Sequence, residues 1–329
     1  MPFVSLLKCC RCLFTLMLLC ASLAAFADAG RVSAIDKSRA PLPYEVSIST
    51  VELVDDRGEL RSLRVLYPQA TERYPLIVFS HGNWSDNTKY DALVREWVAH
   101  GYVVVMPYHL DGGGMMRGIF NSLRYGQLGL ISERAKDVHW IIDALPELAE
   151  KSPELSARMQ MDNIAVTGHS FGAYTAQQMI GAGAFDEDDQ SWVYARHERV
   201  KAVVAISPPG PMFTTITELS WQSVDKPMLV TTGTEDVNDT FWPDWRSHLL
   251  SFDGAKPGHN YSLVVDNADH YLGNLICRPE RETPPQHEAL GVINDASLAF
   301  LDWHLKGKAT ALWPPKETRR VGQAVYNQR

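Results

Sequence analysis

From about residue 44 the chain carries two kinds of hydrophobic segment, and each predicts a different kind of strand. Val46–Val54 and Leu60–Tyr67 alternate apolar and polar residues around the turn Asp55-Asp56-Arg57-Gly58, which predicts an antiparallel hairpin. Later runs are short and almost wholly apolar, as expected of strands buried on both faces of a parallel sheet. These runs are Pro75–Ser80, Tyr102–Pro107, Ile164–Thr167, Val200–Ile206, Met228–Thr232 and Tyr261–Val265.

Helical segments separate most of these apolar runs. We expect helices over Lys89–His100, Glu133–Leu148, Ala173–Ala182, Phe241–Phe252 and Gln286–His304. Alternation of strand and helix is typical of an open, doubly wound α/β sheet. The pattern therefore predicts an α/β fold in which a mostly parallel sheet of about eight strands begins with the antiparallel hairpin. We expect one domain over residues 28–329.

Two segments interrupt this alternation. Leu110–Gly129 contains Gly112-Gly113-Gly114 and follows a strand, so we expect it near the carboxyl edge of the sheet, where ligand sites of α/β proteins form. Ala184–Glu198 contains the acidic run Asp186-Glu187-Asp188-Asp189 and follows a helix. We interpret this second segment as a solvated loop at the opposite edge.

The first residues have the pattern of a secretory signal peptide. Lys8 and Arg11 precede the apolar run Cys12–Ala25, and small residues stand at the −3 and −1 positions of a cleavage site after Ala27. A membrane anchor is the alternative, but 14 residues fall short of the ~20 that span a bilayer. We therefore expect residues 1–27 to be a signal peptide and the protein to be periplasmic or secreted. Cleavage would leave Cys277 as the one cysteine, interpreted as a buried or idle thiol.

Composition and charge are typical of a globular protein that does not bind nucleic acid. The chain is 45% hydrophobic and 21% charged, values that are ordinary for a globular protein. Its formal net charge is -8, and no dense run of lysine and arginine occurs. Phosphate binding relies on clustered cations, so these features argue against nucleic acid as a partner.

Gly168-His169-Ser170-Phe171-Gly172 matches the G-x-S-x-G nucleophile elbow. In that motif a serine occupies a strained turn between a strand and a helix, and the flanking glycines relieve crowding. The strand-like Ile164–Thr167 leads directly into the motif, and a helical segment leads out of it. We therefore predict that Ser170 is a nucleophile.

A serine hydroxyl needs a base to take its proton, and in folds with this motif the chain order is serine, acid, histidine. His270 follows the last predicted parallel strand and is the candidate base, with His259 and His287 as alternatives. The acid is expected just after the strand Met228–Thr232, where a glycine turn leads to Asp236.

Glu235 and Asp239 are the alternatives to this acid. The preceding strand ends in Ser207-Pro208-Pro209-Gly210, which contains no carboxylate.

The oxyanion hole requires two backbone N–H groups directed at the developing negative charge. We expect one from Phe171, directly after the nucleophile. The other is expected from Asn83, in the loop Ser80-His81-Gly82-Asn83-Trp84, with Trp84 as the second choice. Apolar side chains near the predicted strand ends are candidates for a substrate pocket: Trp84, Tyr108, Met115, Phe213 and Trp242.

Together these motifs resemble the α/β-hydrolase superfamily. The resemblance is carried by PLIVFSHGNW, GHSFGAYTA, AISPPGP, GTED and the His270 loop, and it spans most of residues 44–305. Within the superfamily the chain resembles the bacterial predicted dienelactone hydrolases, which are similar to platelet-activating-factor acetylhydrolases. True dienelactone hydrolases use a cysteine nucleophile where this chain has Ser170, and the acetylhydrolases take their acid after the earlier strand, where this chain has Ser207-Pro208. Neither substrate is therefore carried over.

The resemblance implies an α/β-hydrolase fold and a serine esterase. We expect an exported hydrolase that cleaves short-chain or small-molecule carboxylic esters through an acyl-enzyme on Ser170, with no metal or organic cofactor. The alternatives are a lipase or phospholipid acetylhydrolase, for which Leu110–Gly129 would be a brief, glycine-rich lid, and a peptidase or amidase with the same triad. A non-catalytic binding module is disfavoured, because binding would not require triad and oxyanion elements together.

Overall fold

The computed structural model describes residues 42–211, 214–310, 313, 319–321 and 324–329. Leu42–Arg329 form one compact unit. The predicted signal peptide and Phe213 lie outside the described residues.

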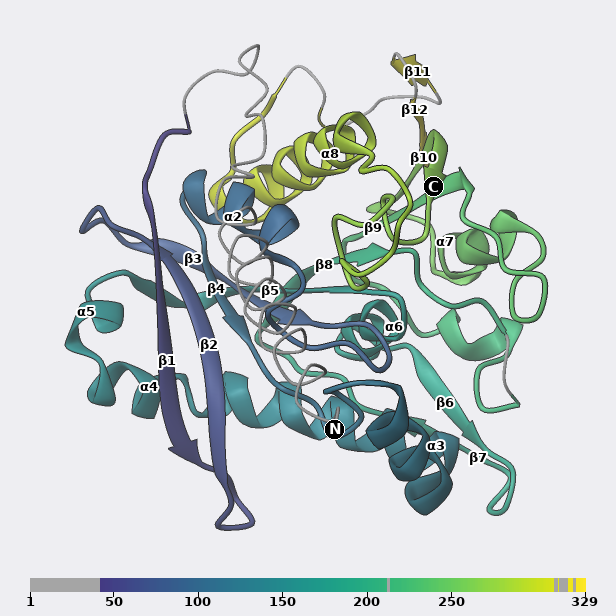
Figure 1. The fold of residues 1–329 in the computed structure, drawn as a ribbon, viewed down its shortest axis with the longest axis horizontal. Helices are drawn as coiled ribbons and strands as arrows, with labels where there is room; N and C mark the ends of the chain where they lie inside the picture. The colour runs from purple at the N-terminus through teal and green to yellow at the C-terminus, as the bar shows by residue number, and fades with distance from the viewer. Residues whose placement is uncertain (1–41, 212–213, 311–312, 314–318, 322–323) are drawn as a thin grey trace, which may run out of the picture. The chain divides into compact units, whose positions relative to one another are not determined.

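A single ten-stranded sheet runs through this unit, in the order β1-β2-β4-β3-β5-β8-β9-β10-β12-β11 (Figure 1). The predicted hairpin is present as β1 (Val46–Val54) and β2 (Leu60–Pro68), and β2 pairs antiparallel with β4 (Val103–Met106). From β4 to β10 every neighbouring pair is parallel. The other parallel strands are β3 (Tyr74–Ser80), β5 (Met159–His169), β8 (Val200–Ile206), β9 (Met228–Glu235) and β10 (Asn260–Asp269).

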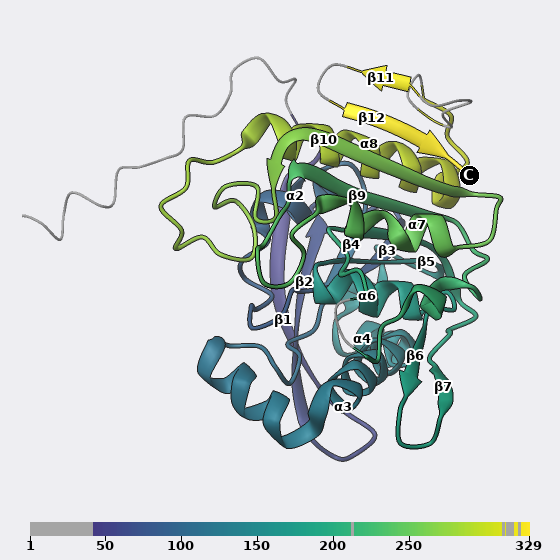
Figure 2. The same cartoon turned by 90° about the vertical axis from the view of Figure 1, so that its right-hand side faces the viewer.

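Helices cover both faces of the sheet, which explains why its central strands are continuously apolar. In β3, Leu76 and Val78 pack into one hydrophobic cluster with α3 (Met115–Asp143), α4 (Leu145–Lys151) and α6 (Phe171–Gln178). The intervening Ile77 and Phe79 pack into a second cluster with α2 (Asp91–Ala99) and α8 (His287–Lys306). Figure 2 shows these two layers on opposite sides of the strands. The predicted doubly wound α/β architecture is confirmed.

Several elements differ from the sequence-based expectations. The helix expected from Glu133 begins at Met115 and kinks at Gly126, whose φ is 66°. The segment interpreted as a solvated loop forms the antiparallel hairpin of β6 (Gly183–Asp186) and β7 (Ser191–Tyr194), with Glu187-Asp188-Asp189 exposed at its turn.

The chain after α8 adds two antiparallel strands to the sheet edge beside β10, β12 (Ala324–Gln328) and β11 (Arg319–Val321). The helix expected over Phe241–Phe252 is divided into a 3-10 turn, η2 (Trp245–Leu249), and α7 (Leu250–Gly254). Short elements also lie at α5 (Pro153–Ser156) and η1 (Glu218–Trp221).

Within the described part of the chain, no helix combines the length and apolar character needed to cross a bilayer. Cys277 is a free thiol and is buried, as expected of a structural cysteine.

Candidate active site

The carboxyl edge of the sheet gathers the residues that the motifs single out. Parallel pairing aligns Ser80 of β3 with Gly168 of β5, and Glu235 of β9 with Asp269 of β10. Because these strands run in the same direction, the loops that follow them leave the sheet at the same edge. Ser170, Asp236, His270 and Asn83 each lie within three residues of such a strand end.

Ser170 occupies a strained turn between β5 and α6. Its φ of 55° and ψ of −125° lie outside the regions that L-residues usually adopt, as expected of a nucleophile elbow. A Cβ at Gly168 would lie 2.2 Å from the Gly172 carbonyl oxygen, and one at Gly172 would lie 2.0 Å from that of Ser80. Both glycines are therefore required for the backbone to pass this closely. Ser170 remains half-buried.

The loops after β9 and β10 bring Asp236 and His270 together. His270 Nδ1 donates to Asp236 Oδ1 over 2.8 Å, which leaves Nε2 as the nitrogen able to accept a proton. Thr232 Oγ1 donates to the other carboxylate oxygen over 3.0 Å. Burial opposes ionisation of Asp236, but His270 and His248 hold its pKa well below the usual range. The alternative residues Glu235, Asp239, His259 and His287 are exposed.

A second histidine, which the sequence analysis did not single out, contacts the same carboxylate. His248 of η2 is buried, and its Nε2 lies 3.0 Å from Asp236 Oδ1, close enough for an ion pair but not aligned as a hydrogen bond. Its Nδ1 lies 2.6 Å from the Pro208 carbonyl oxygen. The Trp242 ring lies against both imidazoles, with centroids 5.6 Å from His248 and 4.9 Å from His270. No motif marks His248, because η2 follows Asp236 through an irregular segment.

His169, the residue before Ser170, joins the predicted oxyanion loop to His270, the candidate base. The Gly82 N–H donates to Tyr90 Oη over 2.8 Å, and that hydroxyl lies 3.1 Å from His169 Nδ1. His169 Nε2 lies 2.8 Å from the His270 carbonyl oxygen, so it carries the proton and Nδ1 accepts from Tyr90. Burial, together with nearby His270, holds the pKa of His169 well below its ordinary value, which keeps the ring neutral.

Two arginines hold the carbonyl groups of the predicted oxyanion loop. Arg134, buried on α3, donates to the carbonyl oxygens of residues 81 and 82 over 2.7 and 3.3 Å. Arg278 donates to those of residues 83 and 84 over 3.0 and 3.2 Å. The Arg134 guanidinium also lies 4.8 Å from the centroid of the Phe171 ring. Since Tyr90 takes the Gly82 N–H, the next N–H group along the loop is that of Asn83.

The proposed pocket residues have different environments. Trp242 lies against His270, as described above. Trp84, at φ 57°, packs so closely on α3 that a Cβ at Gly118 would lie 1.8 Å from its ring. Tyr108 is half-buried beneath Arg117, at 5.5 Å from its ring centroid, and Met115 is 59% exposed at the start of α3.

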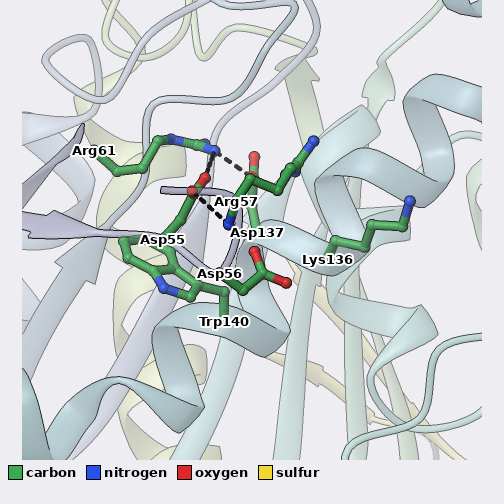
Figure 3. A pocket seen from close by; sticks show the side chains of 7 residues that line it. All are labelled: Asp55, Asp56, Arg57, Arg61, Lys136, Asp137 and Trp140. Carbon is green, nitrogen blue, oxygen red and sulfur yellow. Dashed lines mark hydrogen bonds and ion pairs between the residues drawn. The ribbon is translucent and has the colours of Figure 1, made fainter. Parts of the chain in front are cut away.

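A charged cavity of about 190 Å³ lies between the β1–β2 turn and α3, away from Ser170. Figure 3 shows Arg61 between Asp55 and Asp137, at 3.2 and 2.8 Å, with Trp140 beneath it. The oppositely charged side chains that line this cavity neutralise one another, and none of the predicted triad residues lines the cavity.

Among the described residues, two groups of side chains have ligand atoms within 4.8 Å of one another, close enough to hold a metal ion. In the first, Asp236, His248 and His270, the carboxylate is already shared among the two imidazoles and Thr232. The second consists of His139, Asp143 and His197 near the surface of α3. That the protein needs no cofactor stays a prediction.

Comparisons with known proteins support the fold that this geometry describes. A model of the chlorophyllase family matches residues 42–190. Platelet-activating factor acetylhydrolases from Canis lupus familiaris and Bos taurus are 26% and 22% identical, each over 71% of this chain. The chain spans 58% of the length of these curated relatives.

A solved structure, ferulic acid esterase from Streptomyces cinnamoneus, superposes with a TM-score of 0.61 at 17% identity. The alignment covers 89% of this chain and 98% of that one. These findings confirm the α/β-hydrolase fold and the resemblance to the acetylhydrolases, whereas the narrower likeness to dienelactone hydrolases stays a prediction.

Proposed function

We propose that this chain, which has the α/β-hydrolase fold, hydrolyses carboxylic esters through an acyl-enzyme on Ser170. The observation that carries the proposal is the strained turn at Ser170 and its connection to His270. His169, the residue before Ser170, is hydrogen-bonded to the His270 carbonyl oxygen, and the His270 ring donates to Asp236 over 2.8 Å. The names of the acetylhydrolase relatives and of the esterase with this fold support it.

The reaction follows from the roles of these groups. Ser170 Oγ attacks the ester carbonyl carbon while His270 Nε2 takes the hydroxyl proton, and Asp236 stabilises the resulting imidazolium. The N–H groups of Asn83 and Phe171 stabilise the oxyanion. His270 then returns the proton to the leaving alcohol, and water, activated by the same imidazole, releases the acid and regenerates Ser170.

The two arginines that bind the predicted oxyanion loop support the choice of Asn83. Arg134 and Arg278 bind four successive carbonyl groups of residues 81–84, which restricts how the peptide planes between them can rotate. Fixed donors stabilise a transition state better than donors that must reorient during the reaction.

A chain-length series of p-nitrophenyl esters tests this function and ranks its substrates. We expect the purified protein to cleave acetate and butyrate esters fastest, and a fluorophosphonate to add one mass equivalent and abolish that activity. Peptide and amide substrates tested in parallel distinguish the peptidase alternative. A correctly folded protein that neither cleaves esters nor reacts with the probe would instead be a binding module.

The first part of α3 favours a second candidate, an ester presented in a lipid aggregate. Met116, Phe120 and Leu123 are 79%, 62% and 82% exposed, and Ile119 and Tyr125 are also exposed. Among these, Met116, Ile119, Phe120 and Leu123 are spaced so that they share one face of the helix, and such a patch is unusual on a surface that contacts only water. For this candidate, long-chain esters should be cleaved faster above their critical micelle concentration. Phe120→Ser with Leu123→Ser should remove that gain and leave acetate hydrolysis unchanged.

We also propose that the protein is exported, on the signal-peptide pattern of residues 1–27. The mature protein is expected to begin at or near Asp28. Sequencing the N-terminus of protein recovered from the cell envelope checks this, since retention of Leu13–Ala25 would favour the membrane anchor.

A further inference from the structure

His248 occupies a position that a triad does not require. It is buried, 3.0 Å from the same Asp236 oxygen that accepts from His270, and its other ring nitrogen lies 2.6 Å from the Pro208 carbonyl oxygen. Pro208 belongs to the loop after β8, whereas Asp236 and His270 follow β9 and β10. One imidazole therefore links three successive loops of the carboxyl edge.

The neighbours of His248 determine the protonation state that fits this environment. A carbonyl oxygen can only accept, so the short contact with Pro208 places a proton on Nδ1. In a neutral ring the unprotonated Nε2 would then lie 3.0 Å from Asp236 Oδ1. That carboxylate has no proton to share, because it accepts from His270 and Thr232. Only a doubly protonated imidazolium avoids a buried contact between two acceptors.

The charges around His248 agree with this assignment. Burial tends to lower the pKa of His248, but the Asp236 carboxylate and the Pro208 carbonyl raise it above its ordinary value. The titratable groups that face it are Asp236 and His270, and the rest of its surroundings include the neutral Trp242 ring and Pro208.

We propose that His248 is a positioning residue, a buried imidazolium that keeps Asp236 ionised and aligned on His270 and sets the pH at which His270 can act as a base. This inference rests on the proposed esterase function. The His248 charge balances that of Asp236, so a proton on His270 places a second cation beside it, with ring centroids 5.8 Å apart. Without the His248 charge, His270 would lie beside an unbalanced carboxylate.

His248→Gln removes the positive charge but keeps a polar N–H group, because the side-chain amide is neutral and can still donate towards Asp236. We expect the acid limb of the kcat/KM profile for p-nitrophenyl acetate to move up by about one pH unit. The acid limb of the fluorophosphonate labelling rate should move equally. His259→Gln, on an exposed histidine at the amino end of β10, is the matched control and should leave both profiles unchanged. An active His248→Gln protein with the wild-type acid limb would overturn the inference.

Nitrogen-15 NMR of labelled histidines in the wild-type protein provides a test that requires neither activity nor a variant. Both ring nitrogens of His248 should be protonated at pH 7, and a neutral His248 would overturn the inference even if the variant fails to fold. Loss of the proposed function has a different signature, since the wild-type protein would then neither cleave the ester nor react with the probe.

Discussion

Two Ser-His-Asp arrays lie at the same edge of the sheet, and they differ in the surroundings of the serine. In the first, Asp236 and His270 accompany Ser170. In the second, Ser80 Oγ lies 2.8 Å from His109 Nε2, and His109 Nδ1 lies 2.7 Å from Asp137 Oδ2. The carboxylate fixes the proton on Nδ1 in both arrays, so the Ser80 hydroxyl donates to His109 as a triad serine donates to its base.

The difference lies in access and in what surrounds the serine. Ser80 is fully buried at the end of a central strand, and its oxygen also faces the Arg134 guanidinium at 3.4 Å. Asp137 is held by Arg61 over 2.8 Å, so this array continues into the ion pairs of the charged cavity (Figure 3). Ser170 is half-buried on a strained turn at the start of a helix, where the first backbone N–H groups have no partner within the helix.

A chain of hydrogen bonds from serine to carboxylate therefore does not by itself identify the proposed nucleophile. The Ser80 array ties the oxyanion loop to α3, because Arg134 binds Ser80, the His81 carbonyl and Asp111 together. In the Ser170 array, by contrast, the serine is half-buried on a strained turn at the start of α6.

The largest expected effect is the difference in activity between the Ser170→Ala and Ser80→Ala variants. Ser170→Ala should lower kcat by about 10⁴-fold or more and abolish fluorophosphonate labelling, because the nucleophile is lost. Ser80→Ala should keep the label on Ser170 and lower the free energy of unfolding by about 1–3 kcal/mol, since a buried acceptor loses its donor. Intact-mass spectrometry with peptide mapping measures the label, and urea unfolding measures stability. Label on Ser80 or Cys277 in the wild-type protein would contradict the comparison.

Replacement of the two carboxylates, Asp236 and Asp137, should also have different effects. Asp236→Asn should lower kcat by about 10³–10⁴ in a protein that still folds, because the imidazole loses its orienting partner. Asp137→Asn should change kcat by less than about tenfold and lower the free energy of unfolding by about 2–4 kcal/mol, because Arg61 and His109 lose their anion. Steady-state kinetics and urea unfolding of both variants check this. Near-wild-type activity in Asp236→Asn would move the acid to Glu235 or Asp239.

The smallest expected effect concerns pH. Burial and Arg134 lower the pKa of His109, although Asp137 opposes them, so the folded protein keeps this ring neutral below pH 6.5, where the unfolded chain binds a proton. The stability that His109 contributes is therefore complete above about pH 6.5 and is lost as the pH falls towards its folded pKa.

His109→Gln removes this titration. The free energy of unfolding should then fall less steeply with acidification, by about 1 kcal/mol per pH unit between pH 6 and 5. Urea unfolding at pH 7, 6 and 5 measures the slope, with His259→Gln as the exposed control. An unchanged slope would show that His109 is not held neutral in the folded protein.

Much of the fold and of the candidate site was predictable because its signals are local. Apolar runs long enough for one strand indicated the parallel sheet, since alternate residues must face two separate hydrophobic layers. The elbow is encoded within five residues, because its glycines are required by backbone contacts that any tight turn of this kind makes. Asp236 and His270 were predictable from their places after two strands, because parallel strands bring their carboxyl ends together.

The tertiary structure decided what depends on contacts between distant segments. Glycine at 112–114 and 118 lowers helix propensity, so the sequence pattern did not predict that α3 begins at Met115, yet Gly118 provides the surface on which Trp84 packs. His169 lies within a recognised motif, but its part in joining two loops depends on Tyr90, 79 residues away in the chain. His248 has no motif and no periodicity. Its role can be inferred only from the tertiary structure, in which it is buried between a carbonyl oxygen and a carboxylate. These neighbours, and not its own segment of the chain, set its protonation state.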